Sequence, residues 1–229
     1  MNQYRNTFFK TLTIALLLYV VLGGLLFKVP DLPVIEQSIR NIYFHVGMWF
    51  AMIFILFLGF INSLRYLNTF DLTYDHISYA TVKTGLVFGV LGIITGMIWA
   101  KFTWGAYWVN DPKLNGAAVG IMVYFAYMIL RSSIDDKVKK ARLAAVFNVF
   151  AFVIMFVFIM IMPRISGPSI HPGVDGNPAL ATGDLDPVMR KIFFPAILAW
   201  MLFSYWIFTV VLRSDRINER INELNARFL

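Results

Sequence analysis

The 229-residue sequence contains no cysteine. A chain without thiols cannot carry out thiol–disulfide exchange, cannot hold an iron–sulfur cluster through thiolates, and cannot attach haem through a C-x-x-C-H motif. Any prosthetic group that this chain binds is therefore bound without a thioether bond.

Charged residues are scarce as well: they make up 14% of the chain, against 59% hydrophobic and 17% aromatic residues. A transmembrane helix needs about 20 apolar residues to cross roughly 30 Å of hydrocarbon. We therefore predict an all-α integral membrane protein with six transmembrane helices, at about 11–27, 42–62, 78–100, 115–131, 143–162 and 192–212. These spans and their connections leave no room for a separate soluble domain. Residues 1–229 are thus expected to form a single polytopic membrane domain.

The basic residues are distributed unequally over the two sides of this arrangement. The side that holds both termini carries twelve: Arg5, Lys10, Arg65, Arg131, Lys137, Lys139, Lys140, Arg142, Arg213, Arg216, Arg220 and Arg227. The other side carries seven: Lys28, Arg40, Lys101, Lys113, Arg164, Arg190 and Lys191. The positive-inside rule then predicts that both termini are cytoplasmic. Because basic residues flank the spans, the net charge of +7 indicates contact with the lipid surface rather than with nucleic acid.

The connection between the third and fourth spans is unusually aromatic, reading W-A-K-F-T-W-G-A-Y-W-V-N-D-P-K-L over residues 99–114. Trp and Tyr also gather at membrane interfaces as anchors, and that alternative stays open. Three tryptophans, followed by one acid and one base at Asp111 and Lys113, favour a flat, mostly apolar platform for a large planar ligand. We place this platform in an outer loop at about 101–114, with the residues Trp99, Trp104, Gly105, Tyr107, Trp108 and Asp111.

The predicted topology separates the three histidines. His45 lies at the outer start of the second span, His171 lies in the outer connection, and His76 lies on the cytoplasmic side. A lone histidine at a membrane interface is commonly just a polar helix end. Two histidines on the same face as the platform instead indicate axial ligands of haem iron, because imidazole is a common iron ligand.

The outer connection at about 163–191 contains five prolines and four glycines. Such a composition excludes one continuous helix. Long loops of this kind are commonly functional lids or plain linkers. We expect this one to fold over the platform and to present His171.

Four glycines recur along the third span at positions 85, 89, 92 and 96. This spacing puts them on one stripe of a helix, where small residues allow another helix to approach closely in lipid. The stripe is expected to pack the helix that delivers Trp99 and Trp104.

The W-G-x-Y-W-x-x-D-P-K-L pattern with a histidine on each side resembles the tryptophan-rich "WWD" signature of the haem-handling proteins of cytochrome c maturation. Length and six spans resemble the CcmC branch, the haem exporter protein C family, more than the longer CcmF and CcsA proteins. The resemblance covers nearly the whole chain. It implies that His45 and His171 are the axial ligands of non-covalently bound haem b, and that Arg40 and Lys113 are partners for its propionates.

The resemblance also implies a function without bond chemistry of its own, so that the chain is not an enzyme. CcmC-like proteins present haem on the outer surface to the periplasmic haem chaperone CcmE, beside the ABC transporter subunits CcmA and CcmB and the small subunit CcmD. The expected location is the bacterial cytoplasmic (inner) membrane, with the haem site on the periplasmic face.

Two positions depart from the family pattern. Asn110 stands where the family usually has the last Trp of the motif, so one stacking surface is missing or comes from elsewhere, with Tyr107 as the candidate. The chain has His45-Val46-Gly47 where the family often has His-Val-Pro. Neither change touches a proposed ligand.

Three other functions remain open. A CcsA-like or CcmF-like haem lyase component would present haem to apocytochrome, although those relatives are longer and carry more spans and histidines. A b-type electron-transfer cytochrome would bury its paired histidines within the spans. A small-molecule transporter would use the outer aromatics only as a belt.

Overall fold

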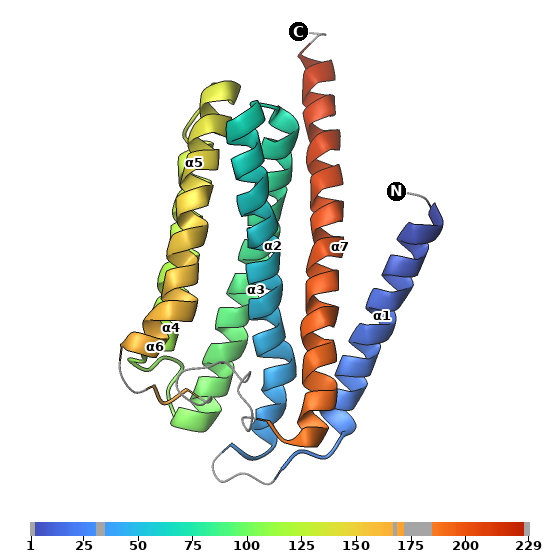
Figure 1. Cartoon of the computed structure of the whole chain (residues 1–229), viewed down its shortest axis with the longest axis vertical. Helices are drawn as coiled ribbons and strands as arrows, with labels where there is room; N and C mark the ends of the chain where they lie inside the picture. The colour runs from blue at the N-terminus through green and yellow to red at the C-terminus, as the bar shows by residue number, and fades with distance from the viewer. Residues whose placement is uncertain (1–2, 31–34, 167–168, 172–184, 227–229) are drawn as a thin grey trace.

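The computed structural model describes residues 3–30, 35–166, 169–171 and 185–226 (Figure 1). Within these ranges the chain is helical and contains no strand. The elements are α1 (Gln3–Leu26), the 3-10 helix η1 (Glu36–Asn41), α2 (Ile42–Thr69), α3 (Leu72–Trp104), α4 (Pro112–Ser132), α5 (Lys137–Phe156), the π-helix η2 (Val157–Ile161), α6 (Met162–Ile165) and α7 (Pro187–Asn225).

Six helical stretches are long and apolar enough to cross a membrane: Asn6–Leu26, Glu36–Thr69, Leu72–Trp104, Pro112–Ser132, Lys137–Ile165 and Pro187–Asn225. They match the six predicted spans one for one, so the prediction of an all-α protein with six potential membrane spans is confirmed. Most of the helices extend beyond the predicted ends. Hydropathy detects only the part of a helix that suits hydrocarbon, whereas the polar residues beyond it still continue the backbone hydrogen bonds.

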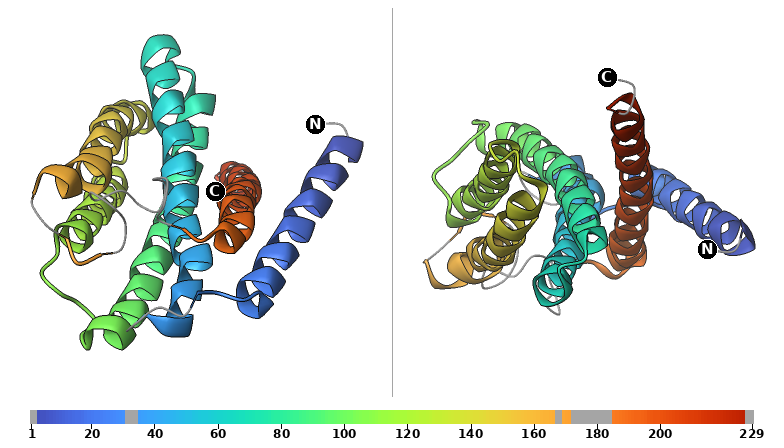
Figure 2. Two further views of the ribbon diagram at one scale, coloured as in Figure 1. Left: turned by 60° about the horizontal axis from the view of Figure 1, so that its bottom comes forward. Right: turned by 90° about the horizontal axis from the view of Figure 1, so that it is seen from above.

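The helices stand side by side in a row rather than in a ring (Figure 2). The pair α4 and α5 lies at one side, α2 and α3 form the centre, and α7 separates this centre from α1. Both termini lie toward the same end of the bundle, and the aromatic connection between α3 and α4 lies at the opposite end (Figure 1). The assignment of the first end to the cytoplasm stays a prediction from the basic residues.

Aspartate side chains cap the N-termini of four helices. Asp71, Asp111, Asp136 and Asp186 occupy the N-cap positions of α3, α4, α5 and α7, and each accepts a hydrogen bond from a backbone N–H of the first turn. These N–H groups have no partner inside the helix, so a carboxylate there satisfies one of them. At the exposed α2–α3 connection, the backbone N–H of Thr73 lowers the pKa of Asp71.

The glycine stripe of α3 packs against α2, as the sequence predicted. A Cβ atom built on Gly85, Gly89, Gly92 or Gly96 would lie 2.5–2.9 Å from Leu56, Met52, Trp49 and His45 of α2, in that order. The two helices run antiparallel, so glycines later in α3 meet side chains earlier in α2. The last two steps bring Trp49 and His45 directly onto the backbone of α3.

The Trp-rich connection is shorter than the predicted loop at about 101–114, which is a correction. Helix α3 continues to Trp104 and α4 begins at Pro112, so Trp99 and Trp104 belong to a helix. Gly105 ends α3 in the left-handed conformation (φ +81°), and its N–H donates to the carbonyl of Lys101. Only glycine adopts that conformation without steric cost, which explains why the helix ends here.

Ion pairs join the helices at the end of the bundle away from the aromatic connection. Arg131 of α4 makes two hydrogen bonds to the carboxylate of Asp75 on α3, at 2.7 and 2.6 Å. Lys83 of α3 pairs with Asp215 of α7. The described part of the predicted outer connection begins with α6 and resumes at Leu185; most of the residues between them, 167–168 and 172–184, lie outside the described residues.

Candidate functional site

A cavity opens at the end of the bundle that carries the aromatic connection. Its walls come from α2, α3, the residues before and after the start of α4, the π-helix η2, and the short segment 169–171. The lining is apolar except for two imidazoles, one lysine and the indole N–H groups. A mostly apolar lining with a few convergent polar groups is typical of a small-molecule site.

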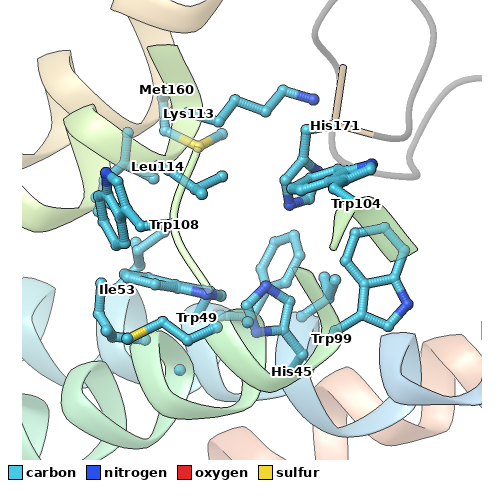
Figure 3. A pocket seen from close by; sticks show the side chains of 18 residues that line it. His45, Trp49, Ile53, Trp99, Trp104, Trp108, Lys113, Leu114, Met160 and His171 are labelled. Carbon is cyan, nitrogen blue, oxygen red and sulfur yellow. The ribbon is translucent and has the colours of Figure 1, made fainter. Parts of the chain in front are cut away.

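His45 and His171 meet in this cavity, although one begins α2 and the other lies in the segment after α6 (Figure 3). Their ring centroids are 6.3 Å apart and the ring planes differ by 30°. A metal–imidazole nitrogen bond is about 2 Å long, so two imidazoles bound to one ion from opposite sides have ring centres on the order of 6 Å apart. The two rings are therefore spaced as a pair of ligands to a single ion between them.

Helix α3 orients the ring of His45. Its Nδ1 lies 3.1 Å from Oγ1 of Thr95, and that hydroxyl donates its own hydrogen to the carbonyls of Leu91 and Gly92, at 2.8 and 3.1 Å. Because the hydroxyl hydrogen is used in this way, Thr95 Oγ1 accepts a hydrogen bond from the Nδ1–H of His45. Nε2 then carries the free lone pair and is the nitrogen able to bind a metal.

The glycines at this end of α3 set the distance between His45 and α3. A Cβ on Gly96 would lie 2.7 Å from Cε1 of His45, closer than real Cβ atoms come to other heavy atoms. The histidine ring thus occupies the volume that a side chain at position 96 would fill. This explains the last glycine of the stripe as a requirement of the site rather than of helix packing alone.

His171 lies among the indoles at the end of α3. Its ring centroid is 5.9 Å from the rings of both Trp99 and Trp104, which themselves pack edge to face at 5.1 Å. The N–H of His171 donates to Oγ of Ser169 at 3.1 Å. The ring of the second predicted ligand is therefore held inside the cavity by aromatic contacts and by the backbone of its own segment.

Three predicted platform residues line the cavity: Trp99, Trp104 and Trp108. A fourth indole was missed by the sequence reasoning, since Trp49 also lines the cavity and packs edge to face on His45, with centroids 6.2 Å apart. Its position four residues after His45 puts both side chains on one face of α2, and that spacing is a signal the sequence does contain. Thr95 and Met160 of η2 carry no comparable sequence signal.

The other three predicted platform residues lie outside the cavity lining. Gly105 ends α3, and Tyr107 is 56% exposed with Nζ of Lys101 5.7 Å from its ring. Asp111 is 2% exposed and is the N-cap of α4. Tyr107 therefore does not replace the missing motif tryptophan in this structure; the additional indole of the cavity is that of Trp49.

Only one of the two candidate propionate partners lies at the cavity. Lys113 lines the cavity. Arg40 does not; its Nη1 donates to the carbonyls of Gly24 and Phe27 at 2.8 and 2.6 Å, and its Nε donates to Gln37. Arg40 thus stabilises the C-terminal end of α1, where carbonyls lack partners within the helix.

Both departures from the family pattern have a structural counterpart. Gly47 leaves room for the indole of Trp200, whose Nε1 donates to the carbonyl of Tyr43 at 2.9 Å; a side chain at position 47 would collide with that ring. Asn110 accepts a hydrogen bond from Asn115 at 2.8 Å, and Asn115 accepts one from Nε1 of Trp108 at 3.3 Å. Asn110 therefore helps to orient Trp108 instead of supplying an indole.

The third histidine is remote from the site, as predicted. His76 lies near the start of α3, at the other end of the bundle, and its Nδ1 is 3.5 Å from a carboxylate oxygen of Glu219 on α7.

The residues of the cavity fit a large, flat, metal-centred ring system such as haem. Two imidazoles offer nitrogen ligands to one ion, four indoles offer flat apolar surfaces, and Lys113 offers a positive charge at the wall. Aromatic rings stack favourably on other π-systems, and a lysine pairs with carboxylates such as haem propionates. Without cysteine in the chain, the same cavity offers no group for a thioether bond.

Comparison with known proteins agrees with this reading. The family model "Cytochrome C assembly protein" matches residues 3–168, which include His45 and the Trp-rich segment and end shortly before His171. Heme exporter protein C of Escherichia coli (strain K12) is 24% identical over 204 residues, 83% of this chain and 74% of that protein. Cytochrome c biogenesis protein CcsA of Prochlorococcus marinus (strain MIT 9303) is 33% identical over 88 residues, 38% of this chain and 28% of that protein. The chain thus covers less than a third of the length of such CcsA relatives.

Proposed function

Because this chain belongs to the cytochrome c assembly protein family, we propose that it binds haem b without a covalent bond and passes it on during cytochrome c maturation. Haem is then the cargo of the site, and the chain is a haem-handling subunit rather than an enzyme. The recipient is a periplasmic haem chaperone of the CcmE kind. The other partners are an ABC transporter like CcmA and CcmB and a small subunit like CcmD, as the likeness to heme exporter protein C suggests.

A single observation carries the proposal: His45 and His171, far apart in the sequence, face the same indole-lined cavity with ring centroids 6.3 Å apart. Haem supplies an iron ion with two free axial positions, and axial-ligand identity is one of the ways in which a protein controls it. His45 contributes Nε2 from a fixed tautomer, Trp49, Trp99, Trp104 and Trp108 exclude water around the ring, and Lys113 attracts a carboxylate. Binding of this type can be reversed, which a transfer function requires.

The position of the cavity supports a site at the membrane surface. It lies at the end of the bundle, between the first turns of α2, the last turns of α3 and the first turns of α4. A cargo bound there can be reached by a water-soluble protein. If the positive-inside prediction holds, this is the periplasmic face of a bacterial inner membrane.

The first experiment measures haem binding by the purified chain in lipid nanodiscs, using hemin as the probe. The wild-type protein is expected to show the Soret and α/β absorbance of a six-coordinate, low-spin haem. His45→Ala and His171→Ala should each weaken binding and remove the low-spin spectrum, because each leaves one axial position without a histidine. His76→Ala is the matched control and should bind hemin like the wild type. An absence of haem binding by the wild type, or its loss in His76→Ala alone, would overturn the assignment.

A CcsA-like haem lyase component is the second candidate, and the local identity of 33% to CcsA proteins favours it. The two candidates differ in the recipient of haem. The haem-loaded chain should therefore be mixed with a CcmE-like chaperone in one experiment and with an apocytochrome c in the other. Haem-dependent co-purification with the chaperone supports transfer to the chaperone, and haem-dependent co-purification with apocytochrome alone supports the lyase.

A further inference from the structure

The carboxylate of Asp111 divides its two oxygens between different parts of the chain. Oδ1 accepts a hydrogen bond from the N–H of Lys113 at 2.8 Å and so caps α4. Oδ2 accepts hydrogen bonds from Oγ of Ser169 at 2.8 Å and from the N–H of Ile170 at 3.0 Å. A helix cap needs only one acceptor, so the second oxygen has a separate role.

That second oxygen is linked to His171 through Ser169. The hydroxyl of Ser169 donates its hydrogen to Asp111. Oγ of Ser169 in turn accepts a hydrogen bond from the N–H of His171 at 3.1 Å. Asp111 is 2% exposed, and hydrogen bonds to a buried carboxylate are about twice as strong as those between neutral groups. The chain of bonds Asp111–Ser169–His171 thus fixes the backbone from which the imidazole enters the cavity.

The two histidines are consequently held in different ways. His45 is part of the long helix α2, with Gly96 against one edge of its ring and Thr95 on its Nδ1. His171 lies in a segment outside any helix; its backbone N–H donates to Ser169, whose hydroxyl donates to Asp111. The position of His45 is thus set by helix packing, whereas the position of His171 depends on the bonds from Asp111 and Ser169 and on the contacts of its ring with two indoles.

We propose that Asp111 is the positioning residue of His171. This inference rests on the proposed haem-binding function. It gives the acidic residue of the Trp-rich segment a role at the second ligand, 60 residues further along the chain, in addition to its role as a helix cap. Because Asp111 also begins α4 next to Trp108, the platform and this ligand share one anchor.

The variants separate the cap from the anchor. Asp111→Ser keeps a good N-cap residue but removes the second oxygen, and Ser169→Ala removes the hydroxyl between Asp111 and His171 without touching α4. Asp136→Ser, at the N-cap of α5, is the control for exchanging an acidic cap. Ser166→Ala is the control for losing a nearby hydroxyl, since Ser166 bonds only within its own turn, to the carbonyl of Met162.

Hemin titration in nanodiscs is read by absorbance and electron paramagnetic resonance. Asp111→Ser and Ser169→Ala should bind hemin about 10-fold or more weakly, with a five-coordinate, high-spin spectrum like that of His171→Ala. Added imidazole should restore the low-spin spectrum in these variants, because it supplies the missing ligand. Both control variants should keep the wild-type spectrum. Ser169→Ala should cause no further loss in a His171→Ala background.

The outcomes separate a failure of the Asp111 inference from a failure of the proposed haem binding. If wild-type protein binds hemin with a six-coordinate spectrum and the two variants keep that spectrum, the anchoring role of Asp111 is wrong and haem binding stands. Equal losses from Ser169→Ala with and without His171 would also overturn it, because a general structural effect adds to any background. A wild-type protein that binds no hemin overturns both.

Discussion

The close contact between Gly96 and His45 yields a sharp test of the site. A methyl group added at position 96 would lie 2.7 Å from Cε1 of His45, whereas ordinary contacts begin at 3.4 Å. In Gly96→Ala the imidazole must therefore move by several tenths of an ångström or rotate away from Thr95. Gly89→Ala is a matched control from the same stripe, since its methyl group would meet Sδ of Met52 at 2.8 Å, two turns away.

The stability of the two variants should be similar. Alanine favours a helix interior over glycine by about 1 kcal/mol. Overpacking costs about 1–3 kcal/mol, which leaves a net loss of at most about 2 kcal/mol in either variant. Met52 is unbranched and adapts to a new neighbour, whereas the ring of His45 is rigid and tied to Thr95. The difference between the variants should therefore appear in ligand binding.

Hemin affinity and spectrum, measured beside thermal stability, decide the outcome. Gly96→Ala should lose about 10-fold or more in affinity, as is typical when a neighbour that orients a metal ligand is disturbed, and should lose the low-spin spectrum. Gly89→Ala should keep both. If Gly96→Ala binds hemin normally and with a six-coordinate spectrum, α3 does not hold the ring of His45 in the way described, and the inference that this contact positions the ligand is refuted.

Two further predictions concern the platform and the tautomer of His45. Trp108→Ala should weaken hemin binding by about 2- to 12-fold, because a stacked aromatic pair contributes about 0.5–1.5 kcal/mol beyond burial. Tyr107→Ala, its exposed neighbour outside the cavity, should have no effect, and equal losses in both would indicate a general disturbance of the loop. Thr95→Val should weaken hemin binding about 10-fold or more by removing the acceptor for His45 Nδ1–H, while Thr95→Ser should restore it. A normal hemin affinity in Thr95→Val would show that the tautomer is fixed by other groups.

The membrane spans were predictable because a helix that crosses a bilayer needs an apolar segment of a minimum length. Each crossing needs about 20 apolar residues, and that length can be read directly from the sequence. The ends of the helices were less accessible. The segment from Lys101 to Trp104 reads as part of a loop, since a lysine follows the apolar run, yet it is the last turn of α3. The π-helix η2 inside the predicted fifth span has no signature in the hydropathy of the segment.

The two histidines and three tryptophans of the site were identified by placing them on one side of the membrane, without any knowledge of distances. Lys113 and Arg40 were both candidates from the family resemblance, and their predicted side of the membrane could not separate them, because both lie on that side. Only the structure gives Arg40 to the carbonyls at the end of α1. The orientation of Tyr107 was equally inaccessible, since a residue in a loop has no periodicity that predicts its direction. The bond from Asp111 to Ser169 joins segments 58 residues apart and leaves no local pattern.

The departures from the family motif show that the side chains lining a cavity describe a site better than the residues of a sequence motif do. The motif's usual last tryptophan is absent, yet four indoles surround the two imidazoles because α2 contributes Trp49. That contribution depends on the antiparallel match of α2 with the glycine stripe, which sets Trp49 against Gly92 and His45 against Gly96. The asparagine in the motif position is in turn used to orient Trp108 through Asn115. Helix register thus places His45 and Trp49, whereas the Trp-rich connection contributes Trp108 and, through Asp111, holds the segment of His171.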